Sequence, residues 1–169
     1  MKFLLRKEDI ERKVEELAKE IKREYEGKNP ILIGVLKGSF IFLSDLIRRL
    51  DFPLEVDFVE VSSYGMGKGS SGKIRVRKGI RSDIKNRHVL IVEDIVDTGL
   101  TTKYLIESLK KKKPASIKLC SLLSKPSRRK VHVDIDFLGF EIPDKFVVGY
   151  GLDFAEKYRN LPYITEVEE

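Results

Sequence analysis

Several residue types are scarce or missing in this chain, and each absence excludes something. Glutamine does not occur, and the 169 residues include only one cysteine and two histidines. The single thiol, Cys120, cannot form an internal disulfide and has no metal-ligand spacing, so we expect it to be buried and inert. His88 and His132 lie far apart in the sequence and flank apolar segments. Neither therefore fits a zinc motif.

Long hydrophobic runs are also missing. No run of about 18 apolar residues occurs, so the sequence predicts no transmembrane helix and no membrane contact. The first residues are too short for a signal peptide, because acidic residues begin at Glu8. We therefore expect a cytoplasmic protein. The lack of glutamine, together with 36% charged residues, favours a thermophilic source.

The composition that remains is that of a globular, moderately basic protein. The length and the 41% hydrophobic content indicate one domain, residues 1–169, with a sizeable core. A net charge of +6 favours anionic ligands. The basic residues are scattered and the basic runs lack interleaved aromatics, so we expect small phosphorylated substrates and no nucleic acid.

Hydrophobic periodicity predicts alternating strands and helices. The expected helices cover residues 8–25, 40–50 and 99–112. The expected strands cover residues 31–36, 54–61, 74–78, 88–92, 117–123, 133–140 and 146–149, and residues 153–163 read as irregular. This alternation indicates right-handed βαβ units, and hence an α/β fold with a mostly parallel sheet. In such sheets ligands bind at the carboxyl ends of the strands, so Lys37, residues 93–102 and Lys125 should meet around one crevice.

The stretch VLIVEDIVDTG, residues 89–99, carries the strongest chemical signal. Free backbone N–H groups at the following helix start would bind a phosphate. Glu93, Asp94 and Asp97 would repel that phosphate unless they faced hydroxyl groups or a metal ion. No Gly-Lys-Ser/Thr sequence is present, which excludes a nucleotide P-loop. The stretch therefore predicts a sugar-phosphate site, although Asp97 alone could be a helix N-cap.

Residues 62–73 carry four glycines and four serines. Long glycine-rich loops in compact domains are often functional, so this segment is either a mobile lid or a plain hairpin connection.

These motifs together resemble one family. Residues 89–99 are similar to the phosphoribosyl-pyrophosphate signature of type I phosphoribosyltransferases. The segments LKGS (36–39), SSYG (62–65) and GFEIPDKFVVGY (139–150) resemble the hypoxanthine-guanine phosphoribosyltransferases, and the agreement runs from about Ile31 to Pro162. The resemblance implies the type I fold, with a central sheet flanked by helices, a small hood and a flexible lid loop. It also implies a homodimer or homotetramer.

The resemblance further implies the activity and the roles of individual residues. The reaction would transfer ribose 5-phosphate from phosphoribosyl pyrophosphate to a 6-oxopurine, with Mg²⁺ as cofactor. Asp97 would be the general acid/base. The phosphoribosyl group would contact Glu93, Asp94, Asp97, Thr98, Gly99, Leu100 and Thr101. Pyrophosphate would contact Lys37, Gly38 and Arg159, with a cis peptide near Lys37, and the lid would include Ser63 and Tyr64. The purine would contact Ile95, Lys125, Phe146 and Val147. Asp153 would hold the metal, with Glu93 and Asp94 nearby.

Other interpretations stay open at this level. Phe146 could be an ordinary core residue, Lys125 a solvated turn lysine, Arg159 a surface arginine, and Asp153 the cap of a local turn. The arginines and lysine at 128–130 read as surface or interface residues. The enzyme could instead use xanthine, adenine or a pyrimidine. The chain could also be a regulator that senses the substrate without catalysis.

Overall fold

The computed structural model describes residues 2–64 and 73–168, without the side chains of residues 63 and 64. The elements in chain order are β1 (Lys2–Leu5), α1 (Lys7–Tyr25), β2 (Ile31–Leu36), α2 (Phe40–Ile47), β3 (Glu55–Tyr64), β4 (Lys73–Lys78), β5 (His88–Val96), α3 (Leu100–Lys110), β6 (Ser116–Ser124), the short 3₁₀ helix η1 (Pro126–Arg128), β7 (Phe137–Glu141), β8 (Val147–Val148) and β9 (Ile164–Glu166).

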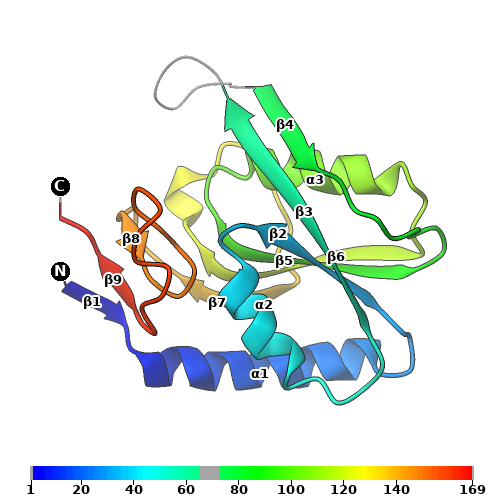
Figure 1. Ribbon diagram of the computed structural model, residues 1–169, viewed down its shortest axis with the longest axis horizontal. Helices are drawn as coiled ribbons and strands as arrows, with labels where there is room; N and C mark the ends of the chain where they lie inside the picture. The colour runs from blue at the N-terminus through cyan, green and yellow to red at the C-terminus, as the bar shows by residue number, and fades with distance from the viewer. Residues whose placement is uncertain (1, 65–72, 169) are drawn as a thin grey trace.

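Over these residues, six strands form the central sheet in the order β4-β3-β2-β5-β6-β7 (Figure 1). All neighbouring pairs are parallel except β3 and the edge strand β4, which are antiparallel. The predicted α/β class and mostly parallel sheet are therefore confirmed. The carboxyl ends of β2, β5 and β6 lie side by side, because Ile31 of β2 pairs with Val89 of β5 and Val89 with Ile117 of β6.

The two faces of the sheet are covered by different helices, and the strands alternate between them. Leu90 and Val92 of β5 join the core beneath α1 and α2. Val89 and Ile91 of the same strand join the core beneath α3. A parallel strand buried on both faces needs apolar residues at every position, which explains the continuous apolar runs. Cys120 is a buried free thiol in the first core, as predicted, and burial raises its pKa.

A second, three-stranded sheet stands beside the main one in the order β1-β9-β8 (Figure 1). It corresponds to the expected hood. The sequence reading missed β1 and β9, and it assigned residues 146–149 to a strand without placing that strand in a separate sheet. These strands contain four, three and two residues, too few for hydrophobic periodicity to reveal.

Several predicted boundaries were wrong in ways that matter for the site. Strand β5 continues to Val96, so Glu93 and Asp94 lie within the strand and not in the turn after it. The strand expected at residues 133–140 begins only at Phe137. The ends of the expected 62–73 loop belong to β3 and β4, and residues 65–72, where the lid was predicted, lie outside the described residues. In the parts of the chain that are described, no helix is long and apolar enough to cross a membrane.

Candidate active site

A cavity of about 240 Å³ opens at the carboxyl ends of β2, β3 and β5. It is lined by Val35, Leu36, Gly38, Val61, Glu93, Asp94, Ile95, Asp97, Thr98, Gly99, Thr101 and Thr102. The fold thus brings together the turn after β2 and the acidic segment, as the parallel topology predicted. Lys37 and Lys125, which were expected around the same crevice, are not among the lining residues in the described part of the chain. A ligand here would meet carboxylates on one side and a helix start on the other.

Glu93 and Asp94 form an acidic pair at the floor of this cavity. Glu93 is only 6% exposed. Burial raises the pKa of Glu93 well above its usual range, and the neighbouring charge of Asp94 raises it further. Burial also raises the pKa of Asp94, although the Ile95 N–H donates to its Oδ1 at 2.8 Å and Arg159 lies close enough to oppose the shift. Such a pair would be stabilised by hydroxyl donors or by a cation.

The turn after β2 packs directly against this pair. The Leu36–Lys37 peptide bond is cis, as the resemblance implied. A Cβ atom added at Gly38 would lie 1.9 Å from Asp94 Oδ2, so no residue with a side chain fits there without displacing the carboxylate. The glycine therefore allows the backbone of the Lys37–Gly38 turn to approach Asp94.

The start of α3 forms the opposite wall. Gly99 is the residue before the helix and has a φ of +86°, in the left-handed region that favours glycine. A Cβ atom there would lie 2.9 Å from Val133 Cγ2. The Thr98 hydroxyl accepts a hydrogen bond from the Leu100 N–H at 3.3 Å. The helix start with its hydroxyl groups faces the cavity, a suitable place for an anion.

Asp97 has a partner that the sequence reading missed. Its Oδ1 lies 2.6 Å from Nε of Arg128, and Nη1 of Arg128 lies 3.7 Å from Asp144 Oδ2. The carboxylates raise the pKa of Arg128, chiefly through the hydrogen bond to Asp97. Arg129 donates to the Asp97 carbonyl oxygen at 3.0 Å and to Ser124 Oγ. These arginines follow β6, the neighbour of β5, so sheet order was the signal that could have placed them here.

The residues assigned to the purine come from two parts of the fold: Ile95 and Lys125 from the ends of β5 and β6, and Phe146 and Val147 from the hood. Lys125 is buried, and its backbone N–H donates to the Val96 carbonyl oxygen at 2.9 Å. Phe146 is 46% exposed and therefore not a core residue, whereas Val147 is buried. The ring of Phe154, another residue missed by the sequence reading, meets the Phe146 ring edge-on at 5.6 Å. Ile95 lines the cavity.

Arg159 and Asp153 lie together in the irregular segment after β8. Nη2 of Arg159 lies 3.4 Å from Asp153 Oδ1. Nη1 of Arg159 donates to the Gly151 carbonyl at 2.7 Å, so the arginine is tied to its own segment rather than solvated. Ser63 and Tyr64, assigned to the lid, form the end of β3, where their backbones pair with Ile74 and Lys73.

The carboxylates present are compatible with magnesium. No three or more His, Cys, Asp or Glu gather around a common point in the described part of the chain. Mg²⁺ keeps several waters and needs only one or two carboxylates besides substrate oxygens. The donors near the cavity are oxygen donors, and the raised pKa values of Glu93 and Asp94 mark buried acids that a cation would stabilise. The donor set therefore fits this ion.

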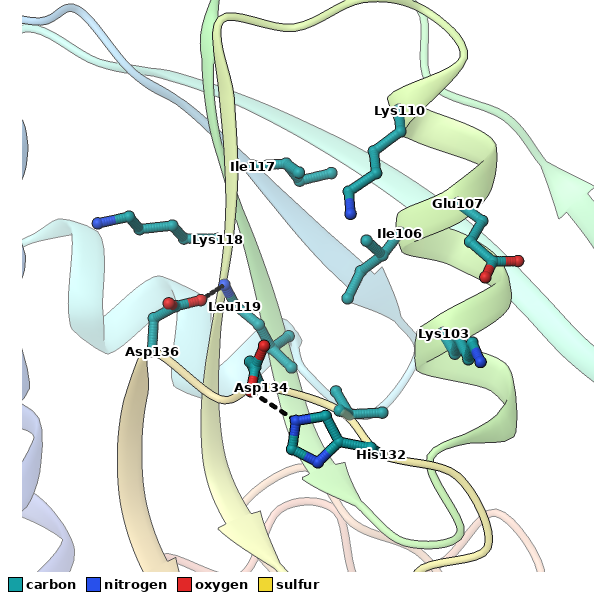
Figure 2. A pocket seen from close by; sticks show the side chains of 11 residues that line it. Lys103, Ile106, Glu107, Lys110, Ile117, Lys118, Leu119, His132, Asp134 and Asp136 are labelled. Atoms are coloured by element: carbon teal, nitrogen blue, oxygen red, sulfur yellow. Dashed lines mark hydrogen bonds and ion pairs between the residues drawn. The ribbon is translucent and has the colours of Figure 1, made fainter.

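A second cavity, of about 260 Å³, lies between α3, β6 and residues 132–136 (Figure 2). His132 Nε2 lies 2.7 Å from Asp134 Oδ1 at its rim, and both side chains are exposed. Asp136 accepts a hydrogen bond from the Leu119 N–H. None of the predicted site residues whose side chains are described lines this cavity, so it is separate from the acidic crevice.

Comparison with known proteins defines the class to which this fold and site belong. Residues 2–155 match the model of the phosphoribosyl transferase domain, so the chain belongs to the phosphoribosyltransferase family.

Individual relatives narrow the class to the hypoxanthine-guanine phosphoribosyltransferases. The enzyme of that name from Bacillus subtilis is 52% identical over 163 residues, which cover 96% of this chain and 91% of the relative. A crystal structure of one from Bacillus anthracis superposes with a TM-score of 0.95 at 46% identity and covers 99% of both chains. The chain also matches a bifunctional TilS/HprT protein from Listeria monocytogenes at 48% identity, but it spans only about a quarter (25%) of that relative's length.

Proposed function

We propose that this protein transfers the 5-phosphoribosyl group of phosphoribosyl pyrophosphate to hypoxanthine or guanine in purine salvage. The products are IMP or GMP and pyrophosphate. The observation that carries the proposal is that one cavity is bounded by the Glu93–Asp94 pair, the start of α3 and the turn after β2 at Gly38. The similarity to hypoxanthine-guanine phosphoribosyltransferases over almost the whole chain supports the choice of purine.

The donor would lie along the β5–α3 segment. The helix start from Thr98 to Thr101 would cradle the 5′-phosphate through backbone N–H groups and hydroxyls. Glu93 and Asp94 would accept hydrogen bonds from the two ribose hydroxyls, which supply the donors that these buried acids need. The pairing of polar hydroxyls with acids and of phosphate with amides matches the two chemically different walls of the cavity.

The pyrophosphate would lie between the turn after β2 and Arg159. Lys37 and the Gly38 backbone contact it from one side and Arg159 from the other, and the cations would offset the charge that builds up on the leaving group. A magnesium ion held by Asp153, with Glu93 and Asp94 nearby, would supply further charge neutralisation.

The purine would lie on the Phe146 ring at the hood side. Lys125 is a donor only, so it suits the 6-oxygen of hypoxanthine or guanine and not the 6-amino group of adenine. Ile95 would contribute apolar contact, and the Val147 backbone would add polar recognition at the edge of the ring. Asp97 would face N7 of the base.

In the reaction, the bond from C1 of the ribose to the pyrophosphate oxygen breaks and a bond from C1 to N9 of the purine forms. The transition state should resemble an oxocarbenium ion. The purine loses a proton, which the Asp97 carboxylate can accept or orient at N7. Closure of a lid that includes Ser63 and Tyr64 would keep water away from the cationic centre.

The experiment is a pyrophosphate-release assay with magnesium phosphoribosyl pyrophosphate and a panel of hypoxanthine, guanine, xanthine, adenine and uracil. We expect release with the first two bases and none above background with adenine or uracil. Preference for xanthine would reassign the base, because Lys125 suits that 6-oxopurine equally well. No release with any base, combined with salt-dependent binding to a specific nucleic acid, would favour a regulator instead.

We further propose that residues 1–169 act as one catalytic domain within a homodimer or homotetramer in the cytoplasm. The family resemblance supports this assembly. Light scattering on the purified chain would give its mass directly, and a mass of 19.5 kDa, that of one chain, would contradict the proposal.

A further inference from the structure

One exposed acid, Glu156, lies between the two cations assigned to pyrophosphate. Lys37 Nζ lies 3.3 Å from Glu156 Oε2. Nη2 of Arg159 lies 3.4 Å from Oε1 and 3.5 Å from Oε2 of the same carboxylate. A single negative group therefore bridges a lysine and an arginine that are 122 positions apart in the sequence. No motif or periodicity in the sequence draws attention to it.

The backbone around Glu156 holds its side chain in this place. Ala155 and Glu156 have φ values of +53° and +65°, a left-handed conformation that residues with side chains rarely adopt. The Glu156 N–H donates to Asp153 Oδ2 at 2.8 Å, which fixes the turn.

The two segments that carry the cations are also in direct contact. A Cβ atom added at Gly151 would lie 2.3 Å from the Gly38 carbonyl oxygen, so the backbones touch. Nη1 of Arg159 donates a hydrogen bond to the Gly151 carbonyl oxygen at 2.7 Å. The relative position of Lys37 and Arg159 is thus set by the fold, and Glu156 lies between their charged ends.

The position of Glu156 is unusual for the proposed chemistry. A subsite for an anion gains nothing in affinity from an acid, because like charges repel and the acid occupies the same cations. Glu156 is 65% exposed at its side chain, so its ion pairs are weak enough for a more highly charged group to replace them. Pyrophosphate carries several negative charges and would take over both cations.

We propose that Glu156 is a positioning residue of the pyrophosphate subsite that tunes its affinity. Its carboxylate holds the charged ends of Lys37 and Arg159 together while the subsite is empty, and it competes with the diphosphate group for them. Glu156 therefore weakens the binding of pyrophosphate and favours its departure as a product. This inference rests on the proposed function, because it assumes that Lys37 and Arg159 bind pyrophosphate.

The decisive variant is Glu156→Gln, which keeps the shape of the side chain and removes its charge. Glu156→Asp keeps the charge. Glu26→Gln is the matched control, because it makes the same charge change at an exposed position. Glu26 lies before the amino end of β2, whereas the cavity opens at the carboxyl end of that strand. Binding of inorganic pyrophosphate in the presence of magnesium chloride is measured by calorimetry at low and high salt.

We expect Glu156→Gln to lower the Kd for pyrophosphate by roughly three- to tenfold at low salt, the scale set by losing two exposed ion pairs. The gain should shrink at high salt, because screening weakens the competing pairs. KM for phosphoribosyl pyrophosphate should fall in parallel, without a rise in kcat. Glu156→Asp should bind close to wild type, and Glu26→Gln should not change the affinity.

The outcomes separate this inference from the proposed function. If wild type binds pyrophosphate but Glu156→Gln binds it equally or more weakly, Glu156 is only a brace of the turn and the inference is wrong. If Glu26→Gln raises the affinity for pyrophosphate as much as Glu156→Gln does, the effect reflects net charge alone and the inference is also wrong. If the wild-type protein neither binds pyrophosphate nor releases it in the assay, the proposed function is wrong, and the inference that depends on it is wrong as well.

Discussion

Glu93 is an acid placed where water hardly reaches, and this links the stability of the protein to pH. Burial raises its pKa above that of the unfolded chain, so the folded protein takes up the proton more readily. The Glu93 carboxyl therefore makes its full stabilising contribution to the free energy of unfolding at pH values below its pKa in the unfolded chain, about 4.3. It is lost as the pH rises through the raised pKa, because the folded state must then hold a buried charge. A site built from buried acids costs stability at neutral pH.

Replacement of Glu93 by glutamine should reverse this cost. We expect Glu93→Gln to raise the melting temperature at pH 8 by at least about 2 °C, the shift that about 1 kcal/mol produces in a domain of this size. The difference from wild type should vanish near pH 4, and pyrophosphate release should fall. Scanning calorimetry across this pH range checks the expectation. An unchanged or lower melting temperature at pH 8, beside an unaffected Glu107→Gln control, would contradict it.

Asp97 is the residue on which the proposed proton transfer depends. Asparagine has the same shape but cannot accept the purine proton, so we expect Asp97→Asn to lower kcat by roughly 100-fold or more. Asp144→Asn is the matched control, since Asp144 also faces Arg128, at 3.7 Å, but is not assigned to the substrate. Steady-state kinetics with hypoxanthine makes the comparison. Wild-type turnover in Asp97→Asn would remove the residue from its role.

At the scale of elements, the site is held by the packing of one turn on another. The turn around η1 contacts the β5–α3 segment through the Arg128–Asp97 ion pair and through Arg129. The Lys130 N–H also donates to the Thr98 carbonyl at 2.9 Å. The basic run at 128–130, predicted as surface or interface residues, is largely exposed and at the same time braces the β5–α3 segment.

Loss of this brace should affect both stability and turnover. We expect Arg129→Met to lower the free energy of unfolding by about 1–3 kcal/mol, because it removes two partly buried hydrogen bonds while keeping an aliphatic stem. The kcat/KM for phosphoribosyl pyrophosphate should fall as the segment loosens. Urea unfolding and initial-rate kinetics measure the two effects. Arg12→Met, at an exposed position of α1, should change neither; equal losses in both variants would refute the brace.

The strength of the local signals decided which elements could be predicted. The strand at 31–36 and the helix that became α1 follow from uninterrupted apolar runs and helical spacing, and both were confirmed within a residue or so. The predicted end of β5, at Val92, was wrong because acidic residues normally mark the end of a buried strand. Here Glu93 continues the ladder by pairing with Ser121 of β6, a contact that local sequence does not specify.

At the scale of the whole molecule, the two chain ends build the hood beside Phe146 and Val147, two of the residues proposed to bind the purine. β1 pairs with β9, and β9 pairs with β8, whose Val147 follows Phe146. The Val167 N–H donates to the Phe146 carbonyl at 2.9 Å. The position of the proposed stacking ring therefore depends on residues from both ends of the sequence.

Deletion of residues 2–5 should weaken purine binding selectively. We expect KM for hypoxanthine to rise about two- to tenfold, the cost of ordering one or two loosened side chains. The Kd for pyrophosphate should change less, because Lys37 and Gly38 of its proposed subsite lie outside the hood and Arg159 is held by the Gly151 carbonyl of its own segment. Kinetics and calorimetry on one preparation compare the two. Phe3→Ala, which removes the contact with the Tyr163 ring at 4.6 Å, provides a milder variant if the deletion does not fold. Equal losses for both ligands would contradict the division of the site.

The sequence by itself determined the mostly parallel sheet and the meeting of the acidic segment with the turn after β2 at the carboxyl ends of the strands. Those features follow from local patterns, because a buried parallel strand and the helix that follows it are each encoded within about 20 residues. The tertiary structure alone decided that Arg128 faces Asp97, that Glu156 bridges Lys37 and Arg159, and that the chain ends form one sheet. These are pairings between distant residues, fixed by how the elements pack, so no local spacing could reveal them.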